Sequence, residues 1–332
     1  MSGKTEQPVR VGVIGFGRQG ENHTKAMQKR PQEFRLRAVC DITPSRQQVA
    51  RDVYGMEAYA DMDAFLATDV ELAFITTNSS SHRDFAVRAA AAGKHVMVEK
   101  PLCMNGKEAA DMLAAARRHG VLLSCFQQRR WDVDACRVRK ALRDGLVGEP
   151  FLIENRSAGG GPAVGYGTPD FNQQWRVTRA LGGGTIYDFG PHWFDQVLSL
   201  LPGQQVVQVF ADVRHFTWGD ADDYFDVKLV FANGCRATVS KCDIAYVKWP
   251  KWLIHGTTGG LRYDDTCVVR NAAGEQVIEE GDARPDMFAN LYAAVRQGQP
   301  LAVTAEQAER TIKLIDAAFA SAEAGRSLDV MI

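Results

Sequence analysis

The first 125 residues alternate short apolar runs with stretches of helical periodicity. The apolar runs predict strands at residues 9–14, 36–40, 72–75, 95–98 and 121–125. The stretches between them predict helices at residues 19–30, 45–54, 82–92 and 107–119. Strands that alternate with helices of this length are typical of parallel βαβ units. We therefore expect residues 1–126 to form an α/β domain with a Rossmann-type, doubly wound parallel sheet.

After about residue 148 the pattern changes to successive strands separated by turns such as Ala232-Asn233-Gly234. Strands are expected at residues 151–156, 206–216, 224–231, 235–242, 249–255, 261–263 and 267–270. Helices are expected at residues 134–144, 186–201, 285–297 and 305–324, with a glycine-rich loop at 159–167. Turns of this type join antiparallel hairpins. Residues 127–332 are therefore predicted to form an α+β domain with a large, mostly antiparallel sheet.

Composition narrows the classes of partner. The 332 residues carry a formal net charge of −1, so no large basic field attracts nucleic acid or an anionic membrane. The seven cysteines form no Cys-x-x-Cys pair, which speaks against a zinc site and is typical of reduced thiols. Because no apolar stretch resembles a signal peptide or a membrane span, we expect a cytoplasmic protein without a bound metal.

A glycine motif follows the first predicted strand directly. Residues 15–20 are Gly-Phe-Gly-Arg-Gln-Gly, and a helix is predicted to begin there. Strand, glycine turn and helix in this order predict a dinucleotide site. Gly15 permits the tight turn, Gly17 lets the backbone approach the pyrophosphate, and Gly20 lets helix and strand pack closely. A glycine turn used only for chain reversal is the alternative.

Asp41 ends the second predicted strand, 21 residues after Gly20. An acidic residue at this place binds the adenosine ribose hydroxyls and repels a 2′-phosphate, which favours NAD over NADP. Arg18 and Arg46 are the counterargument, because either side chain could reach a phosphate beside Asp41. In the alternative interpretation, Asp41 only caps the turn before Pro44.

Seven short segments carry a resemblance to a known family. They are Thr76-Thr77-Asn78 with His82, Ala92-Gly93-Lys94-His95-Val96, Glu99-Lys100-Pro101, Arg129-Arg130-Trp131-Asp132, Trp175-Arg176, Gly182-Gly183-Gly184 and Asp188-Phe189-Gly190-Pro191-His192. In order and spacing the chain resembles the Gfo/Idh/MocA family of glucose–fructose oxidoreductases and inositol dehydrogenases over nearly its whole length. Thr77 departs from the proline that is usual there.

The resemblance implies a set of site residues. The catalytic residues it implies are Lys100, Asp188 and His192. With the glycine motif, it implies cofactor contacts at Gly15, Phe16, Gly17, Arg18, Gln19, Gly20, Asp41, Ile42, Arg46, Thr76, Thr77, Asn78, His82, Glu99, Lys100, Gln128, Trp175 and Arg176. Substrate contacts are implied at Lys100, Gln127, Arg129, Tyr166, Asp188 and His192. It also implies a sugar-like substrate and a homodimer or homotetramer formed through the antiparallel sheet.

The residue types suit acid–base chemistry. Lys100 follows an apolar strand, at an end of the sheet where such folds bind ligands, although a surface lysine paired with Glu99 is the alternative. Asp188 and His192 are four residues apart and share one face if the predicted helix is continuous. Pro191 would bend that helix. In the alternative interpretation, Asp188 caps a helix and His192 packs in the core.

These residues predict an NAD(P)-dependent oxidoreductase that moves a hydride between nicotinamide and a secondary alcohol or ketone of a sugar, cyclitol or related polyol. His192 would remove the hydroxyl proton while Lys100 binds the oxygen. Two alternatives stay open from the sequence. One is an NAD-dependent glycoside hydrolase that oxidises its sugar transiently, and the other is a non-catalytic dinucleotide-binding regulator.

Overall fold

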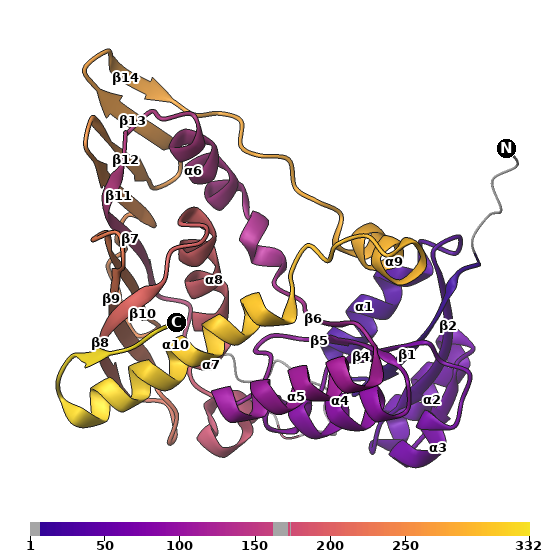
Figure 1. Cartoon of the computed structure of the whole chain (residues 1–332). Coiled ribbons are helices and arrows are strands. Elements are labelled where there is room, and N and C mark those ends of the chain that lie inside the picture. The colour runs from indigo at the N-terminus through magenta and orange to yellow at the C-terminus, as the bar shows by residue number, and fades with distance from the viewer. Residues whose placement is uncertain (1–6, 162–171, 173) are drawn as a thin grey trace, which may run out of the picture. The chain divides into compact units, whose positions relative to one another are not determined.

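The computed structural model describes residues 7–161, 172 and 174–332, which form two compact units (Figure 1). The first unit contains residues 7–126, 172, 174–175 and 286–309, and the second contains residues 127–161, 176–285 and 310–332. The chain therefore returns to the first unit after most of the second is built. The division into two domains at residue 126, which the sequence suggested, stays a prediction.

The first unit is built on a six-stranded parallel sheet with the order β3-β2-β1-β4-β5-β6. Its strands are β1 (Val9–Ile14), β2 (Phe34–Cys40), β3 (Glu57–Tyr59), β4 (Leu72–Ile75), β5 (His95–Val98) and β6 (Leu123–Cys125). Its helices are α1 (Arg18–Gln28), α2 (Pro44–Tyr54), α3 (Met62–Leu66), α4 (His82–Ala91) and α5 (Gly106–His119). The strand order reverses between β1 and β4, and open sheets of this kind bind ligands at that point. The expected Rossmann-type sheet is confirmed.

Strand β3 and helix α3 were not expected from the sequence. Strand β3 has three residues, none of them buried, so it shows no apolar run. It pairs with β2 through Ala38, Val39 and Cys40, which are buried. A short edge strand is defined by this pairing rather than by its own pattern.

Helix α9 (Met287–Gln297) packs in the first unit although it lies far along the chain. The Phe288 ring lies 6.1 Å from the rings of His23 and Phe34. Arg296 donates to Glu71 at 2.7 Å. Helix α9 therefore packs in the first unit, although the sequence analysis placed it in the domain of residues 127–332.

The second unit contains a nine-stranded sheet with the order β14-β13-β12-β11-β7-β10-β9-β8-β15. The strands are β7 (Pro150–Ala158), β8 (Val206–Arg214), β9 (Tyr224–Phe231), β10 (Arg236–Cys242), β11 (Trp252–Gly256), β12 (Gly259–Tyr263), β13 (Cys267–Asn271), β14 (Gly274–Val277) and β15 (Leu328–Asp329). Strands β7 and β10 are parallel, and the other neighbouring strands of this sheet are antiparallel. The expected mostly antiparallel sheet is confirmed, and β14 and β15 are additional strands.

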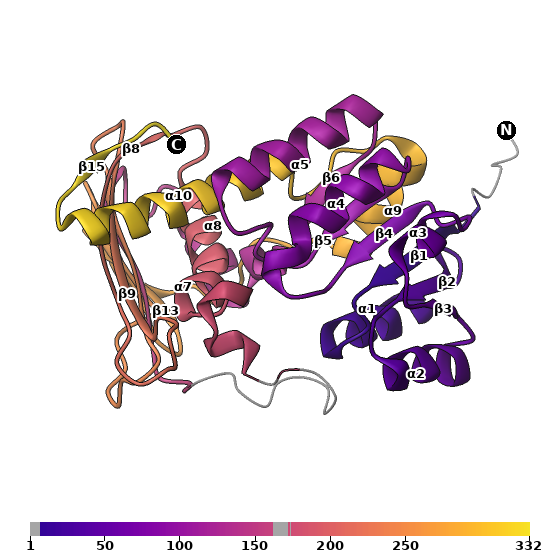
Figure 2. The ribbon, with the colours of Figure 1, turned by 90° about the horizontal axis from the view of Figure 1, so that it is seen from below.

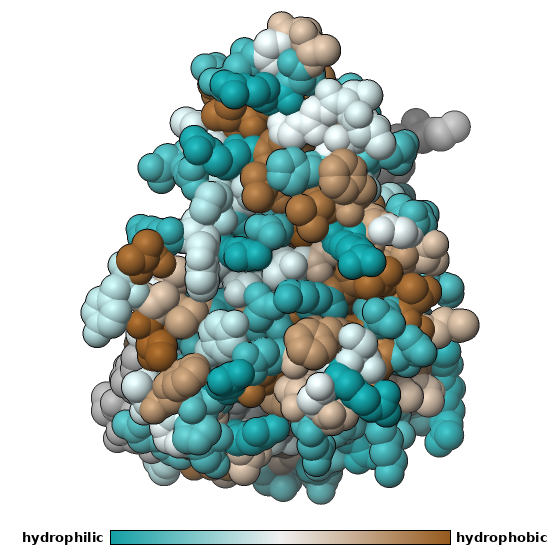
Figure 3. All heavy atoms as spheres, turned by 90° about the vertical axis from the view of Figure 1, so that its left-hand side faces the viewer, coloured by the Kyte–Doolittle hydropathy of each residue, from teal (hydrophilic) through white to brown (hydrophobic). Residues whose placement is uncertain are grey.

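Helices α6 (Val133–Arg143), α8 (Gly190–Leu200) and α10 (Ala305–Ala324) lie on one face of this sheet (Figure 1; Figure 2 gives a second view). Along β8, Val209 and Ala211 are buried and Phe210 is exposed, so the strand has one covered and one open face. Figure 3 shows hydrophilic and hydrophobic residues mixed on the side of the molecule where this open face lies. The alternation fits a sheet covered on one side.

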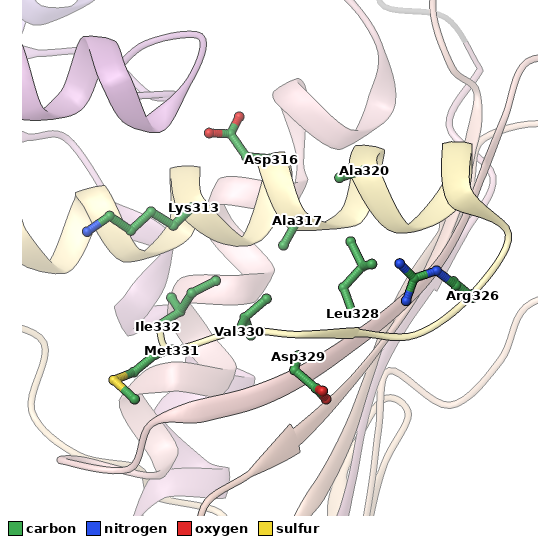
Figure 4. Close-up of a pocket in the computed structure, with 10 residues that line it drawn as sticks. All are labelled: Lys313, Asp316, Ala317, Ala320, Arg326, Leu328, Asp329, Val330, Met331 and Ile332. Carbon is green, nitrogen blue, oxygen red and sulfur yellow. The ribbon is translucent and has the colours of Figure 1, made fainter.

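A groove of about 660 Å³ lies between α10 and the C-terminal strand (Figure 4). Its lining residues all lie between Lys313 and Ile332 and include none of the candidate site residues. Among the described residues, no helix is both long and apolar enough to span a bilayer.

The predicted helix at 186–201 is two helices, α7 (Thr185–Asp188) and α8, with Phe189 between them. Pro191 lies in the first turn of α8, where its missing N–H costs no helical hydrogen bond. The expectation of a proline bend inside one continuous helix is therefore wrong. The break separates Asp188 from the helix that carries His192.

Candidate functional site

The glycine turn joins β1 to α1 in the first unit. Gly15 has φ +84°, and a Cβ there would lie 2.6 Å from Thr77 Cγ2 and 2.9 Å from Thr77 N. A Cβ on Gly20 would overlap the Gly15 carbonyl oxygen and lie 2.8 Å from Thr76 Oγ1. Around a Cβ on Gly17, by contrast, no described atom lies within 4 Å. Two glycines are therefore needed for internal packing, and the third borders open space.

That open space suits a pyrophosphate. Gly17 is the N-cap of α1 and has no side chain to cap the helix. The first N–H groups of a helix have no acceptor within it and attract anions. A phosphate can approach the Gly17 backbone because no Cβ intervenes, so the residues present fit a dinucleotide. Phe16, Arg18 and Gln19 belong to the same turn and first helical residues.

Asp41 joins the glycine turn to the end of β2. Its carboxylate accepts the Phe16 N–H at 2.5 Å and the Thr43 N–H at 2.7 Å. The second bond is the turn cap that the alternative interpretation required, and the first ties the carboxylate to the cofactor loop. Each carboxylate oxygen keeps a lone pair for a ribose hydroxyl. Ile42, the next residue, is 77% exposed.

Arg46 is held within the protein. Its Nε donates to the Phe16 carbonyl at 2.7 Å, and its Nη2 donates to Glu21 at 2.6 Å. Burial raises the pKa of Glu21, but hydrogen bonds from Lys25, Arg46 and Tyr54 outweigh it and lower the pKa to about 2. Glu21 therefore stays charged and retains Arg46, which weakens the case for Arg46 as a 2′-phosphate ligand.

The loop after β4 contains the candidates Thr76, Thr77, Asn78 and His82. Thr76 Oγ1 donates to the Gly15 carbonyl, which links this loop to the glycine turn. The buried ring of His82 lies 2.8 Å from the Pro101 carbonyl and 3.1 Å from the Thr77 carbonyl. Burial lowers the pKa of His82. His82 therefore connects the loop to the segment that carries Lys100, and a direct cofactor contact stays a prediction.

Glu99 faces the interior of the first unit. Its Oε1 lies 2.6 Å from His23 Nε2, and its Oε2 accepts the Lys100 backbone N–H at 3.0 Å. Burial raises the pKa of Glu99, but His23 and Lys100 outweigh it and hold the pKa below its usual range. The Lys100 side chain is half-buried, and its peptide bond to Pro101 is cis. His23, which the sequence analysis missed, therefore supports the Lys100 segment from helix α1.

The candidate residues Asp188 and His192 of the second unit lie on either side of the break between α7 and α8. Asp188 accepts a hydrogen bond from Arg176 at 2.7 Å, and both side chains are less than one-fifth exposed. No side-chain cap bond occurs at the start of α8, so the interpretation of Asp188 as its N-cap is wrong. His192 lies in the first turn of α8 and is 3% exposed.

The glycine triplet before α7 positions Arg176. A Cβ on Gly183 would lie 2.6 Å from the Arg176 carbonyl, and the Gly184 N–H donates to that carbonyl at 2.8 Å. Asp222 Oδ2 accepts the Ile186 N–H at 2.8 Å, and burial raises the pKa of Asp222 to about 7. Local motifs in the sequence pointed to the glycines, whereas Asp222 carried no signal.

The segment after β6 carries the candidates Gln127, Gln128 and Arg129. Gln127 is fully buried, and neither polar atom of its amide has a hydrogen-bond partner in the described part of the chain. Buried polar groups are nearly always satisfied, so this amide suits a ligand. The Arg129 carbonyl accepts a hydrogen bond from Gln196 at 2.6 Å, which joins this segment to α8.

An ion pair that the sequence analysis missed strengthens this junction. Arg130 donates to both carboxylate oxygens of Asp195, at 2.8 and 2.5 Å. Both residues are buried, and Asp195 follows His192 by one helical turn. Bidentate arginine–carboxylate pairs impose a defined geometry. Tyr166 lies outside the described residues, and Trp175 lies in a short 3₁₀ turn that also contains Arg176.

Comparisons with known proteins identify the family. Residues 9–127 match the family model of oxidoreductases with an NAD-binding Rossmann fold, GFO_IDH_MocA, and residues 136–262 match the GFO/IDH/MocA C-terminal domain. The chain therefore belongs to the GFO/IDH/MocA oxidoreductase family. It is an NAD(P)-dependent oxidoreductase that acts on CH–OH groups.

Relatives match over nearly the full length. The inositol 2-dehydrogenase of Rhizobium meliloti is 28% identical, over 97% of this chain and 99% of its own. The scyllo-inositol 2-dehydrogenase (NADP(+)) of Bacillus subtilis is 25% identical, over 96% and 95%. The crystal structure of an NAD-binding protein from Listeria innocua has 25% identity and a TM-score of 0.86, over 97% of each chain. The match therefore extends over both units.

Proposed function

We propose that this protein oxidises a secondary alcohol of a cyclitol or related sugar-like polyol with NAD as the preferred cofactor, or performs the reverse reduction. The supporting observation is the buried His192, which follows the ion-paired Asp188 by four residues across the α7–α8 break, in a unit that also holds the unsatisfied amide of Gln127. The names of the inositol dehydrogenase relatives support the polyol class.

In the proposed mechanism, His192 removes the hydroxyl proton, and Asp188 orients the imidazole and stabilises the imidazolium. Lys100 donates a hydrogen bond to the reacting oxygen. Gln127 and Arg129 bind further substrate hydroxyls. When bound, the nicotinamide supplies the hydride acceptor. The protein contributes position and charge, which hold the reacting groups in the reactive geometry.

The preference for NAD rests on Asp41 and Arg46. Asp41 lies at the end of β2 and accepts a hydrogen bond from the Phe16 N–H of the cofactor loop. Glu21 binds Arg46, which is a nearby positive charge. A carboxylate at this position repels the 2′-phosphate of NADP. Activity that is higher with NADP than with NAD would contradict this assignment.

A panel of inositols, aldoses, sugar acids and alditols, read by NADH and NADPH absorbance, tests the proposal. We expect reduction of NAD with at least one inositol or pyranose, and turnover about 10²- to 10⁴-fold lower in His192→Ala. Release of a chromogenic aglycone without net NADH would instead identify a glycoside hydrolase. Cofactor binding without turnover on the whole panel would favour a regulator.

We also propose a homodimer or homotetramer formed through the open sheet face. That face carries the exposed Phe210 and the exposed Lys228 on adjacent strands. Figure 3 shows hydrophobic and hydrophilic residues mixed on this side, as is usual in interfaces between subunits. Light scattering after size exclusion tests this, and a monomer would contradict it.

We propose a cytoplasmic location, because six of the seven cysteines are buried and burial raises the thiol pKa of Cys40, Cys235 and Cys267 to about 11. Such thiols persist in a reducing compartment. Cell fractionation followed by immunoblotting tests the location, and recovery outside the cytoplasm would contradict it.

A further inference from the structure

A buried lysine lies at the end of β10, in the second unit. Lys241 is 2% exposed, and its ammonium forms an ion pair with Asp243, which is 3% exposed. A lysine is almost never buried to this degree unless it is paired. The sequence motifs and the family resemblance assign no role to either residue.

Lys241 faces the segment that carries the candidate base. Its Nζ lies 4.5 Å from the centre of the Phe189 ring and 5.6 Å from that of Trp193, and these two rings stack 5.0 Å apart. Phe189 is the residue at the break between α7 and α8, and Trp193 directly follows His192. A desolvated ammonium over an aromatic face contributes a substantial cation–π attraction. Lys241 therefore contacts the chain on both sides of His192.

The same ammonium also anchors the start of the glycine-rich loop. It donates to the Gly159 carbonyl at 2.9 Å, while the Gly161 N–H donates to the Asp243 carbonyl at 3.2 Å. Gly159, Gly160 and Gly161 all have positive φ, so this backbone path requires glycine. One ion pair therefore holds both the loop and the break before α8.

The pair is electrostatically coupled to Asp188. Burial raises the pKa of Asp243, Lys241 opposes this, and the negative charge of Asp188 raises it further. In the described part of the second unit, the charged groups around this segment include Arg130, Arg176, Arg179, Asp188, Asp195, Asp222, Asp223, Lys241 and Asp243. Of these, Lys241 and Asp243 pair with each other, and Asp243 is coupled to Asp188 through charge.

We propose that Lys241 and Asp243 are positioning residues that hold His192 and set the charge around the Asp188–His192 segment. The proposal rests on the proposed function of His192 as the base. Lys241 fixes the α7–α8 break through Phe189 and Trp193, and Asp243 balances its charge. Neither residue touches the reacting atoms.

The test measures the ring titration of His192 directly, by NMR of histidine-labelled protein, with a His192 substitution used for assignment. Lys241→Met removes a positive charge and leaves Asp243, so the pKa of His192 should rise by about half a unit or more. Asp243→Asn removes a negative charge, so that pKa should fall by a similar amount. Lys248→Met, an exposed lysine in the same unit, is the matched control and should leave the titration unchanged.

Two further variants separate charge from packing. Because removal of one partner destabilises a buried ion pair, Lys241→Met/Asp243→Asn removes both charges and should return the His192 titration towards wild type. Its kcat should still fall about tenfold or more with unchanged NAD affinity, because the loop anchor is lost. Lys241→Arg should recover part of kcat.

Unmoved titrations in both single variants, or shifts in the same direction, would overturn the proposal. A double variant with wild-type kcat would overturn the positioning role. Failure of the proposed function gives a different result: His192→Ala would retain activity, while the NMR shifts would still occur.

Discussion

The candidate cofactor residues of the first unit, here called the cofactor half, and the candidate substrate residues of the second unit, the substrate half, are arranged in different ways. In the first unit, the cofactor half is a contiguous turn, residues 15–20, joined to Asp41 and to the loop at Thr76 by short hydrogen bonds. In the second unit, the substrate half consists of Gln127, Arg176, Asp188 and His192, which come from separate segments, and Arg176 pairs with Asp188. Backbone geometry governs the first half, and long-range packing governs the second. Substitutions should therefore affect the two halves differently.

The largest expected effect lies in the substrate half, at Asp188 and His192. His192→Ala should lower turnover about 10²- to 10⁴-fold, the scale of one positioned proton-transfer group. Asp188→Asn should also lower turnover, and the double variant should cost barely more than His192→Ala alone, because residues that act together are non-additive. Steady-state kinetics of the four proteins measures this.

The pH profile sharpens the same prediction. The oxidation rate should rise with pH through an ionisation near that of histidine. Asp188→Asn removes a negative charge beside Arg176, so the apparent pKa should fall. Additive penalties, with a profile that ignores Asp188, would mean that the two side chains share no proton path. Lys100 would then be the leading candidate for the base.

The next effect concerns Lys100, the proposed catalytic residue of the first unit. Lys100→Met keeps bulk and removes the charge, so kcat should fall about a hundredfold while NAD affinity changes little. Lys94→Met is the matched control, because Lys94 lies at the opposite end of β5 and donates to the Thr68 carbonyl. Equal turnover in the two variants would mean that Lys100 is a surface lysine without a catalytic role.

In the cofactor half, two glycines should respond differently to the same added methyl group. Gly17→Ala places a Cβ in open space, so the melting temperature should stay near wild type while NAD affinity falls about tenfold. Gly20→Ala places a Cβ against the Gly15 carbonyl, so it should destabilise the protein by about 1–3 kcal/mol and also weaken NAD binding. Thermal unfolding and fluorescence titration measure both. A reversed order would mean that the phosphates do not approach at Gly17.

The smallest effect concerns cofactor choice. Asp41→Ser removes the carboxylate beside the ribose, and a charge-assisted contact contributes about 1.5–3 kcal/mol, so the NAD/NADP ratio of kcat/KM should fall about tenfold or more. Ser keeps a hydroxyl that can accept the Thr43 N–H. Adding Arg46→Ala to this variant should leave the new NADP activity unchanged, because Glu21 binds Arg46 and keeps it from contacting a 2′-phosphate. An unchanged ratio in Asp41→Ser would mean that Asp41 serves only its turn.

The parts that the sequence predicted correctly depend on local geometry. The glycine motif, for example, lies within residues 15–20, and Gly15 has the positive φ of +84° that its tight turn requires. The parts that it missed lack a local signal. Strand β3 has no apolar run, and the break at Phe189 depends on how α7 and α8 pack.

The sequence by itself determined the order of parallel units, the glycine turn and the position of Asp41, because each follows from the residue's own backbone freedom or from periodic burial. Only the tertiary structure revealed that His23 bonds to Glu99 and that Arg130 pairs with Asp195. It alone also revealed that Lys241 contacts Phe189, in the segment before His192. These pairs join residues 65 to 76 positions apart in the first two cases. Charged side chains at such separations have no spacing rule, because their pairing depends on burial, and burial is a property of the whole fold.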